Sequence, residues 1–297
     1  MHRGKNSIAT KKKLQATDYQ RAPIRLLNGV LRGASAVGVA RFALNPTVLI
    51  AAVHPLDTLE VEEEIGLIQH GFSTQLFEIV AKVPTFAEWL MTHDQTAAYA
   101  YMALLLKITS WFRDDPQDKP WLLKSPRHMQ DLHALLQVFP NATLIFPYRD
   151  PVKVVGSSCC MVWNSIVRDS ASVTPEWVGQ EWLKKTERML HKNLKTRAEG
   201  VCDKNQYDVL YADITADWEL AMQGICDFLG RPLTSDARVA MQGWLNSNRQ
   251  HQHDAPKYNL TDFGLDRQEV EQRLTFYRER FNIPFETTNP HLAAATH

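Results

Sequence analysis

The sequence predicts an α/β fold with a small parallel sheet and many helices. Short apolar runs of strand length occur at residues 121–124, 143–148 and 207–211. Segments with helical spacing of apolar residues follow these runs, and the connections between them are short. Because strand, helix and strand in this order form right-handed βαβ units, we expect parallel strands in a three-layer α/β/α arrangement.

Two helices are predicted ahead of the first strand run. Residues 59–83 carry apolar side chains at helical spacing, and we expect this helix to stop at Pro84. The apolar positions are Ile65, Ile68, Phe72, Leu76 and Ile79. Residues 97–112 are apolar on nearly every face, which indicates a helix packed deep in the core.

The first two strand runs end in the same pattern of a capping residue followed by proline. Ser125-Pro126 follows the first run and Asp150-Pro151 follows the second. Proline suits the first helical position because its missing N–H is not needed there. The first helix then has a buried stripe of Leu132, Leu135, Leu136 and Phe139, and the second continues over residues 152–163.

Three further helices are predicted in the second half of the chain. Pro175 opens a long helix, and residues 216–229 form another after the third strand run. Asp266 and Glu269 make an acidic capping box for the last helix, which we expect to end near Phe281.

Composition limits the classes of function. The 297 residues contain no Pro/Gly/Ser-rich linker, so we expect a flexible basic tail at 1–20 and one domain at 21–290. Lys plus Arg and Asp plus Glu both total 33, and this neutral balance argues against a nucleic-acid partner. No apolar run reaches the roughly 18 residues of a membrane span, and no secretory signal is recognisable. Four cysteines without metal-site spacing indicate reduced thiols, no metal and a cytoplasmic location.

Two cations stand at predicted strand ends, Lys124 and Arg149. In open α/β sheets, ligands bind beyond the carboxyl ends of the strands, where helix N-termini offer free N–H groups to anions. Either cation alone is equally well explained as a surface charge or as the partner of a nearby carboxylate. Two such cations, each followed by a proline-started helix, predict an anion pocket.

The stretch WLLKSPRHMQDLHALLQVFPNATLIFPYRDPVKVVGSS resembles the nucleotide-binding core of sulfotransferases that use 3′-phosphoadenosine 5′-phosphosulfate. The resemblance covers about residues 54–285 and implies a P-loop-like fold with this nucleotide as co-substrate and no metal. It implies that Arg149 and Ser157 bind the 3′-phosphate and that Lys124 lies beside the sulfuryl group or phosphate chain. The segments YADITAD and KYNLTDFGLD resemble the part that folds over the nucleotide, which adds Tyr211 and Lys257 as cofactor-binding candidates.

Sulfuryl transfer requires a cation near the departing oxygen and a base for the acceptor hydroxyl. Lys124 fits the first role, and Glu63, His54 and His128 are the candidate bases. None of the three bases is favoured over the others. His128 is equally able to pair with Asp131 at the surface, His54 can be part of a turn, and a run of glutamates is usually a solvated helix face.

The phosphosulfate loop of the family is the one expected part that the sequence matches poorly. The nearest candidate is Arg32-Gly33-Ala34-Ser35, which lacks the paired hydroxyl residues and a preceding apolar strand. We expect residues 24–44 to form a substrate-side helix, so that the first strand and its loop are missing. The resemblance implies an enzyme, but the poor match of this loop means that the sequence does not establish catalysis.

The leading hypothesis is a sulfotransferase that acts on a hydroxyl of a small molecule. One alternative is a homologue that binds adenosine 3′-phosphate nucleotides without turnover, and another is a non-catalytic helical interaction protein. The sequence contains no GxxxxGK[ST] motif, which argues against a P-loop kinase. It predicts neither the acceptor nor the oligomeric state.

Overall fold

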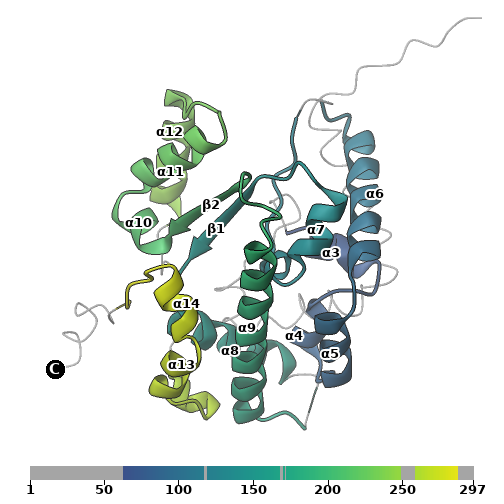
Figure 1. Ribbon diagram of the computed structural model, residues 1–297, viewed down its shortest axis with the longest axis vertical. Coiled ribbons are helices and arrows are strands. Elements are labelled where there is room, and N and C mark those ends of the chain that lie inside the picture. The colour runs from purple at the N-terminus through teal and green to yellow at the C-terminus, as the bar shows by residue number, and fades with distance from the viewer. Residues whose placement is uncertain (1–62, 117–118, 168–169, 171, 249–257, 287–297) are drawn as a thin grey trace, which may run out of the picture.

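The computed structural model describes residues 63–116, 119–167, 170, 172–248 and 258–286. The predictions for the basic tail, residues 24–44, His54 and Lys257 fall outside these ranges. The described chain is rich in helices, which surround one short sheet (Figure 1).

The helices before the sheet are α3 to α7, with one 3₁₀ turn among them. Their bounds are α3 (Ile65–Gln69), α4 (Leu76–Val80), α5 (Pro84–Thr92), α6 (Thr96–Arg113), η1 (Pro126–Met129) and α7 (Leu132–Val138). The elements from the sheet onward are β1 (Leu144–Tyr148), α8 (Pro151–Ile166), α9 (Pro175–Ala198), β2 (Gln206–Leu210), α10 (Tyr211–Ala216), α11 (Trp218–Phe228), α12 (Ser235–Ser247), η2 (Leu260–Phe263), α13 (Arg267–Arg273) and α14 (Thr275–Arg280).

The two strands pair in parallel, with Leu144 opposite Gln206 and Tyr148 opposite Leu210. The crossover between them contains α8 and α9, as the βαβ pattern predicts. Compared with the expected runs at 143–148 and 207–211, β1 begins one residue later and β2 is shifted by one residue toward the N-terminus. The α/β fold class is confirmed.

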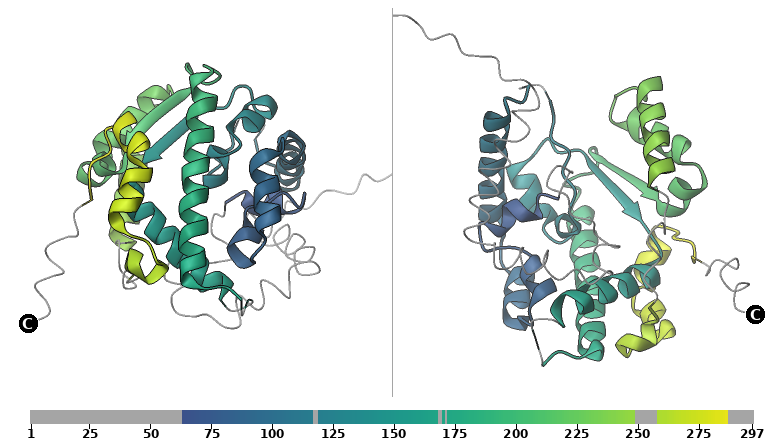
Figure 2. Two further views of the ribbon diagram at one scale, coloured as in Figure 1. Left: turned by 60° about the horizontal axis from the view of Figure 1, so that its bottom comes forward. Right: turned by 180° about the vertical axis from the view of Figure 1, so that it is seen from behind.

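Helices cover both faces of this sheet. On one face, Tyr148 stacks on Phe281, which follows α14, with ring centroids 4.0 Å apart. On the other, Tyr207 stacks on Phe228 of α11 at 5.2 Å. Figure 2 shows the strands between α9 and α14 on one side and α10–α12 on the other. The arrangement has three layers, α/β/α.

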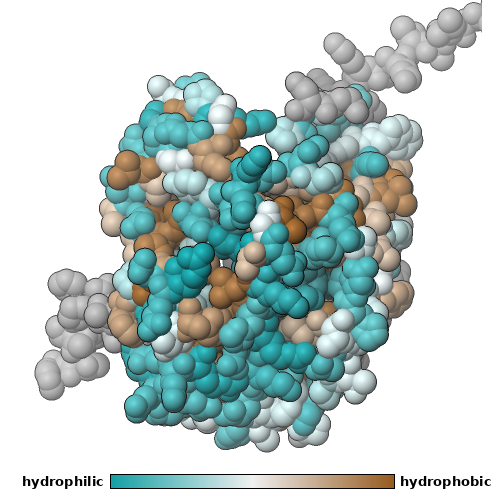
Figure 3. Space-filling view, viewed as in Figure 1, coloured by the Kyte–Doolittle hydropathy of each residue, from teal (hydrophilic) through white to brown (hydrophobic). Residues whose placement is uncertain are grey.

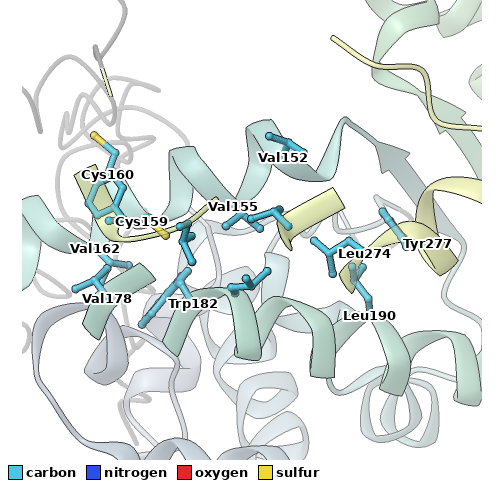
Figure 4. Close-up of a cluster of buried hydrophobic side chains, with 14 of the residues drawn as sticks. Val152, Val155, Cys159, Cys160, Val162, Val178, Trp182, Leu190, Leu274 and Tyr277 are labelled. Carbon is cyan, nitrogen blue, oxygen red and sulfur yellow. The ribbon is translucent and has the colours of Figure 1, made fainter. Parts of the chain in front are cut away.

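The main core lies between α8 and α9. Val155 and Val162 of α8 face Trp182 and Leu190 of α9, and α13–α14 close one end of this apolar layer (Figure 4). The spacing of these residues follows the helical period, so each helix buries one stripe.

A second core joins α3, α6 and α7, and it corrects one prediction. Tyr99 and Met102 of α6 are fully buried, but Leu104 and Trp111 are 50% and 75% exposed. The helix therefore packs on one side only, and hydrophobic residues are visible over it at the right edge of Figure 3. The apolar residues on all faces of this segment therefore do not mean that the whole helix is buried.

The helix predicted for residues 59–83 is also wrong over its described part. Residues 70–75 interrupt it: Phe72 adopts the left-handed conformation with φ of 55°, and the Thr74 hydroxyl accepts the backbone N–H of Leu76 at 3.2 Å. Pro84 then opens α5, because proline is as suitable for a first helical turn as for a stop. This helix was not predicted, and neither was α12.

Four further boundaries differ from prediction. The helix expected from Pro126 onward is divided into the 3₁₀ turn η1, capped by Ser125, and the helix α7, which starts at Leu132. Residues 121–124 form no strand, and Leu122 is 91% exposed.

The helix expected at 216–229 is α11, which starts two residues later because the Asp217 side chain caps it by accepting the Leu220 N–H at 3.0 Å; the separate helix α10 before it was not predicted. The last helix divides at Leu274.

Candidate functional site

The described candidates gather in two clusters. Glu63, Lys124 and His128 lie together near α3 and η1, where Glu64 and Tyr99 join them; we call this set the acid–histidine cluster. The second set surrounds Arg149 at the end of β1, and we call it the arginine cluster.

In the acid–histidine cluster, the Lys124 ammonium pairs with the Glu63 carboxylate. The Lys124 side chain is 75% exposed, so its cation is accessible to a ligand. A backbone hydrogen bond anchors the irregular segment that ends at Lys124. The Lys124 N–H donates to Oε2 of Glu64 at 2.9 Å. A buried acceptor thus positions the residue that carries the exposed cation.

Glu64 is buried, unlike its described neighbour Glu63. Its second oxygen, Oε1, pairs with Nε2 of His128. Burial by itself raises the pKa of Glu64, but the hydrogen bond and charge of His128, with the Lys124 N–H, outweigh it and lower the pKa. Glu64 is therefore a carboxylate at neutral pH.

His128 has protein partners at both ring nitrogens. Nδ1 lies 2.9 Å from the hydroxyl of Tyr99, and burial raises the pKa of that phenol, so it stays protonated. Both ring nitrogens are therefore engaged within the protein, Nε2 with Glu64 and Nδ1 with the Tyr99 hydroxyl. The ring presents no free nitrogen in this arrangement and is suited to holding Glu64. It pairs with Glu64 and not, as the surface alternative supposed, with Asp131.

The arginine cluster begins where β1 passes into α8. Asp150 caps α8 as predicted, since its Oδ1 accepts the N–H of Val152 at 3.0 Å. The Arg149 guanidinium just before it lies over the ring of Tyr211, 4.5 Å from the centroid. Tyr211 reaches this place as the first residue of α10, directly after the neighbouring strand β2.

Arg149 also binds a carboxylate. Its Nε and Nη2 donate to the two oxygens of Glu286 at 2.8 and 3.0 Å, and this pairing raises the pKa of Arg149. The geometry is the two-pronged one that guanidinium groups adopt with carboxylates and phosphates.

Tyr258 links Ser157 to the same cluster. Burial raises the pKa of Tyr258, while the nearby charge of Arg149 and a hydrogen bond with Ser157 act in the opposite direction. The Tyr258 ring lies against Gly156, where a Cβ atom would be 2.5 Å from Cε2. A glycine beside Ser157 is therefore required for this close approach.

Four residues of these clusters escaped sequence reasoning: Glu64, Tyr99, Tyr258 and Glu286. Glu64 belongs to the acidic run in which only Glu63 was a candidate, with a solvated helix face as the alternative, and Tyr258 belongs to the segment KYNLTDFGLD. Tyr99 looked like an ordinary core residue. No sequence signal pointed to Glu286, because it lies 137 positions from Arg149.

Comparison with protein families decides the assignment. The model of the sulfotransferase family matches residues 17–236, which is more than half of the chain. The chain belongs to the sulfotransferase family. A search of curated protein sequences finds no match.

Solved sulfotransferases share the fold. The chain is similar to sulfotransferase STF9 from Mycobacterium avium, with a TM-score of 0.67 and 24% identity over 76% of this chain and 57% of that one. It is also similar to sulfotransferase STF1 from Mycobacterium tuberculosis H37Rv, with a TM-score of 0.66 and 26% identity over 82% of this chain and 62% of that one. It thus spans about three-fifths of the length of these sulfotransferases.

Two features are absent from the described part of this sulfotransferase-family chain. None of its helices is long and apolar enough to cross a membrane. No group of three or more His, Cys, Asp or Glu side chains in the same ranges is arranged to hold a metal ion.

Proposed function

We propose that the protein transfers a sulfuryl group from 3′-phosphoadenosine 5′-phosphosulfate to a hydroxyl of a small molecule. The observation that carries the proposal is the environment of Arg149, which lies just before α8. Its guanidinium stacks on Tyr211 and binds the carboxylate of Glu286. A guanidinium held in this way is suited to a phosphate.

The arginine cluster would bind the nucleotide. Arg149 and the hydroxyl of Ser157 would contact the 3′-phosphate, and Tyr211 and Tyr258, which lie close to the Arg149 guanidinium, would flank it. Lys257 precedes Tyr258 in the chain and stays in the proposal on the sequence resemblance alone.

The acid–histidine cluster would carry out the transfer. The co-substrate supplies the sulfuryl group and leaves as adenosine 3′,5′-bisphosphate. Lys124 would offset negative charge on the departing oxygen. Glu63 is our choice of base, because its carboxylate lies at the Lys124 ammonium and would accept the hydroxyl proton once that ammonium turns to the phosphosulfate.

The other two candidate bases take different places. His128 would act through Glu64, since both of its ring nitrogens are bound within the protein. His54 stays a prediction from sequence. All four cysteines are free thiols, and a cytoplasmic location is part of the same proposal.

Titration calorimetry with adenosine 3′,5′-bisphosphate tests nucleotide binding. Arg149→Ala should weaken binding by at least about 2 kcal/mol, or about 30-fold, because it removes two charge-assisted hydrogen bonds. Arg188→Ala is the matched control, since Arg188 also holds a glutamate, Glu88, with two hydrogen bonds on the surface. Equal affinity of wild type and Arg149→Ala would overturn the assignment of the subsite.

Turnover is measured separately, as release of adenosine 3′,5′-bisphosphate from the phosphosulfate in the presence of small phenols and alcohols. Release that depends on the hydroxyl compound supports a transferase. Nucleotide binding with no transfer to any hydroxyl compound would favour the alternative, a homologue that binds the nucleotide without turnover.

A further inference from the structure

The carboxylate of Glu286 occupies the position on Arg149 that an anionic ligand needs. Both guanidinium hydrogen bonds on this side, at 2.8 and 3.0 Å, go to its two oxygens. A carboxylate and a phosphate present paired oxygens to arginine in the same way. One guanidinium edge cannot bind both at once.

The segment that carries Glu286 is fastened independently of this carboxylate. The Glu286 N–H donates to Oδ2 of Asp150 at 2.9 Å, and Nη2 of Arg278 donates to Oδ1 of the same aspartate at 2.6 Å. Nη1 of Arg278 also donates to the carbonyl of Ile283 at 3.1 Å. None of these three bonds involves the Glu286 carboxylate, so all of them can persist if that side chain turns away.

The Arg149–Glu286 pair is open to solvent, and this makes it exchangeable. The Arg149 side chain is 38% exposed and that of Glu286 is 24% exposed. An ion pair as exposed as this one is weak: forming it changes an equilibrium constant by only about two- to fivefold. A phosphate carries more negative charge than a carboxylate and competes well for such a partner.

Tyr211 keeps the guanidinium in position while the anion is exchanged. Its ring lies under Arg149 at 4.5 Å, and this contact does not involve Glu286. The cation is thus oriented before a ligand arrives.

We propose that Glu286 is an internal competitor that occupies the 3′-phosphate subsite and is displaced when the nucleotide binds. This inference rests on the proposed function, because it concerns the same subsite. Nucleotide affinity then depends on the segment after α14, because this segment carries the competing carboxylate. The ligand that displaces it is a nucleotide with a terminal phosphate monoester.

The test is calorimetric titration of adenosine 3′,5′-bisphosphate into wild type, Glu286→Gln and Glu286→Ala. Both variants should bind about two- to fivefold more tightly than wild type. Glu88→Gln, which disrupts the comparable surface pair with Arg188, should bind like wild type. Thermal unfolding of each variant shows whether the fold is retained.

The outcomes separate this inference from the proposed function. Binding by wild type with no gain in either Glu286 variant overturns only the competitor role. Weaker binding by both variants also overturns it, and would mean that Glu286 supports the site. Absence of binding by folded wild type and both folded variants overturns the nucleotide function and the competitor role together.

Discussion

The backbone N–H of Lys124 donates to Oε2 of Glu64 at 2.9 Å, across 60 positions of sequence. Through this bond, a buried carboxylate fixes the chain next to an exposed ammonium. Glu63, the neighbour of Glu64, pairs with that ammonium. Two adjacent glutamates therefore have different tasks, one in holding the backbone and one at the surface of the site.

Replacement of Glu64 by Gln should lower the free energy of unfolding by about 1–3 kcal/mol, because an uncharged amide is a poorer acceptor for His128 and the Lys124 N–H. The lowered pKa of Glu64 means that this carboxylate stabilises the fold above about pH 4.5 and loses its contribution as pH falls through the lowered value. In urea unfolding, the difference in free energy of unfolding between wild type and variant should shrink below about pH 4.5. A gap that stays constant into the acid range contradicts this role.

Replacement of Glu63 by Gln should reduce sulfuryl transfer by about 10²- to 10⁴-fold, the usual contribution of a general base. Affinity for adenosine 3′,5′-bisphosphate should be unchanged, because Glu63 lies in the acid–histidine cluster and not beside Arg149. Steady-state kinetics and calorimetry measure the two quantities. Glu88→Gln serves as the control, and wild-type turnover in Glu63→Gln would exclude Glu63 as the base.

Lys185 and Glu78 form a buried ion pair between α9 and α4, with side chains only 6% and 4% exposed. Lys185→Met should lower the free energy of unfolding by about 3–5 kcal/mol, since it leaves the Glu78 carboxylate buried without its cation. The double variant Lys185→Met, Glu78→Leu should recover most of that loss, because no charge is then stranded. Chemical denaturation decides between this and a purely steric effect, in which the double variant would be no better than the single one.

Gly179 of α9 lies against the backbone of Phe263, and a Cβ atom would be 2.1 Å from its carbonyl oxygen. Gly179→Ala should therefore cost about 1–3 kcal/mol of stability through overpacking. Gly243 is the matched control, because it lies inside α12 and a Cβ atom added there would meet nothing within 4 Å. Gly243→Ala should stabilise the helix by about 0.5–1 kcal/mol. Similar thermal shifts in the two variants would contradict the proposed clash.

The parts of the fold governed by local rules were predictable from sequence. Asp150 followed by Pro151 marked the start of α8, and Pro175 marked the start of α9. Such signals depend on the chemistry of one helical turn and need no knowledge of distant residues. The short apolar run before Lys124 is followed by a similar signal, Ser125-Pro126, but this signal governs only the helical turn after it, and the run itself forms no strand.

Long-range partners could not be predicted in the same way. Arg149 was identified from its position after a strand, but the identity of its partner, Glu286, depends on where the segment after α14 returns to the sheet. The burial of Glu64 likewise depends on His128 and Tyr99 approaching from two other helices. A run of three glutamates contains no information about which one turns inward.

The parallel pairing of β1 with β2 joins residues about 60 positions apart, from Leu144 opposite Gln206 to Tyr148 opposite Leu210. Neither strand has a hairpin partner next to it in sequence, so this sheet cannot nucleate from a local turn. During synthesis, β1 and its arginine emerge well before β2 and Tyr211 do. The corner of the molecule that holds Arg149 and Tyr211 is therefore assembled only after the two-helix crossover has been translated and has folded back.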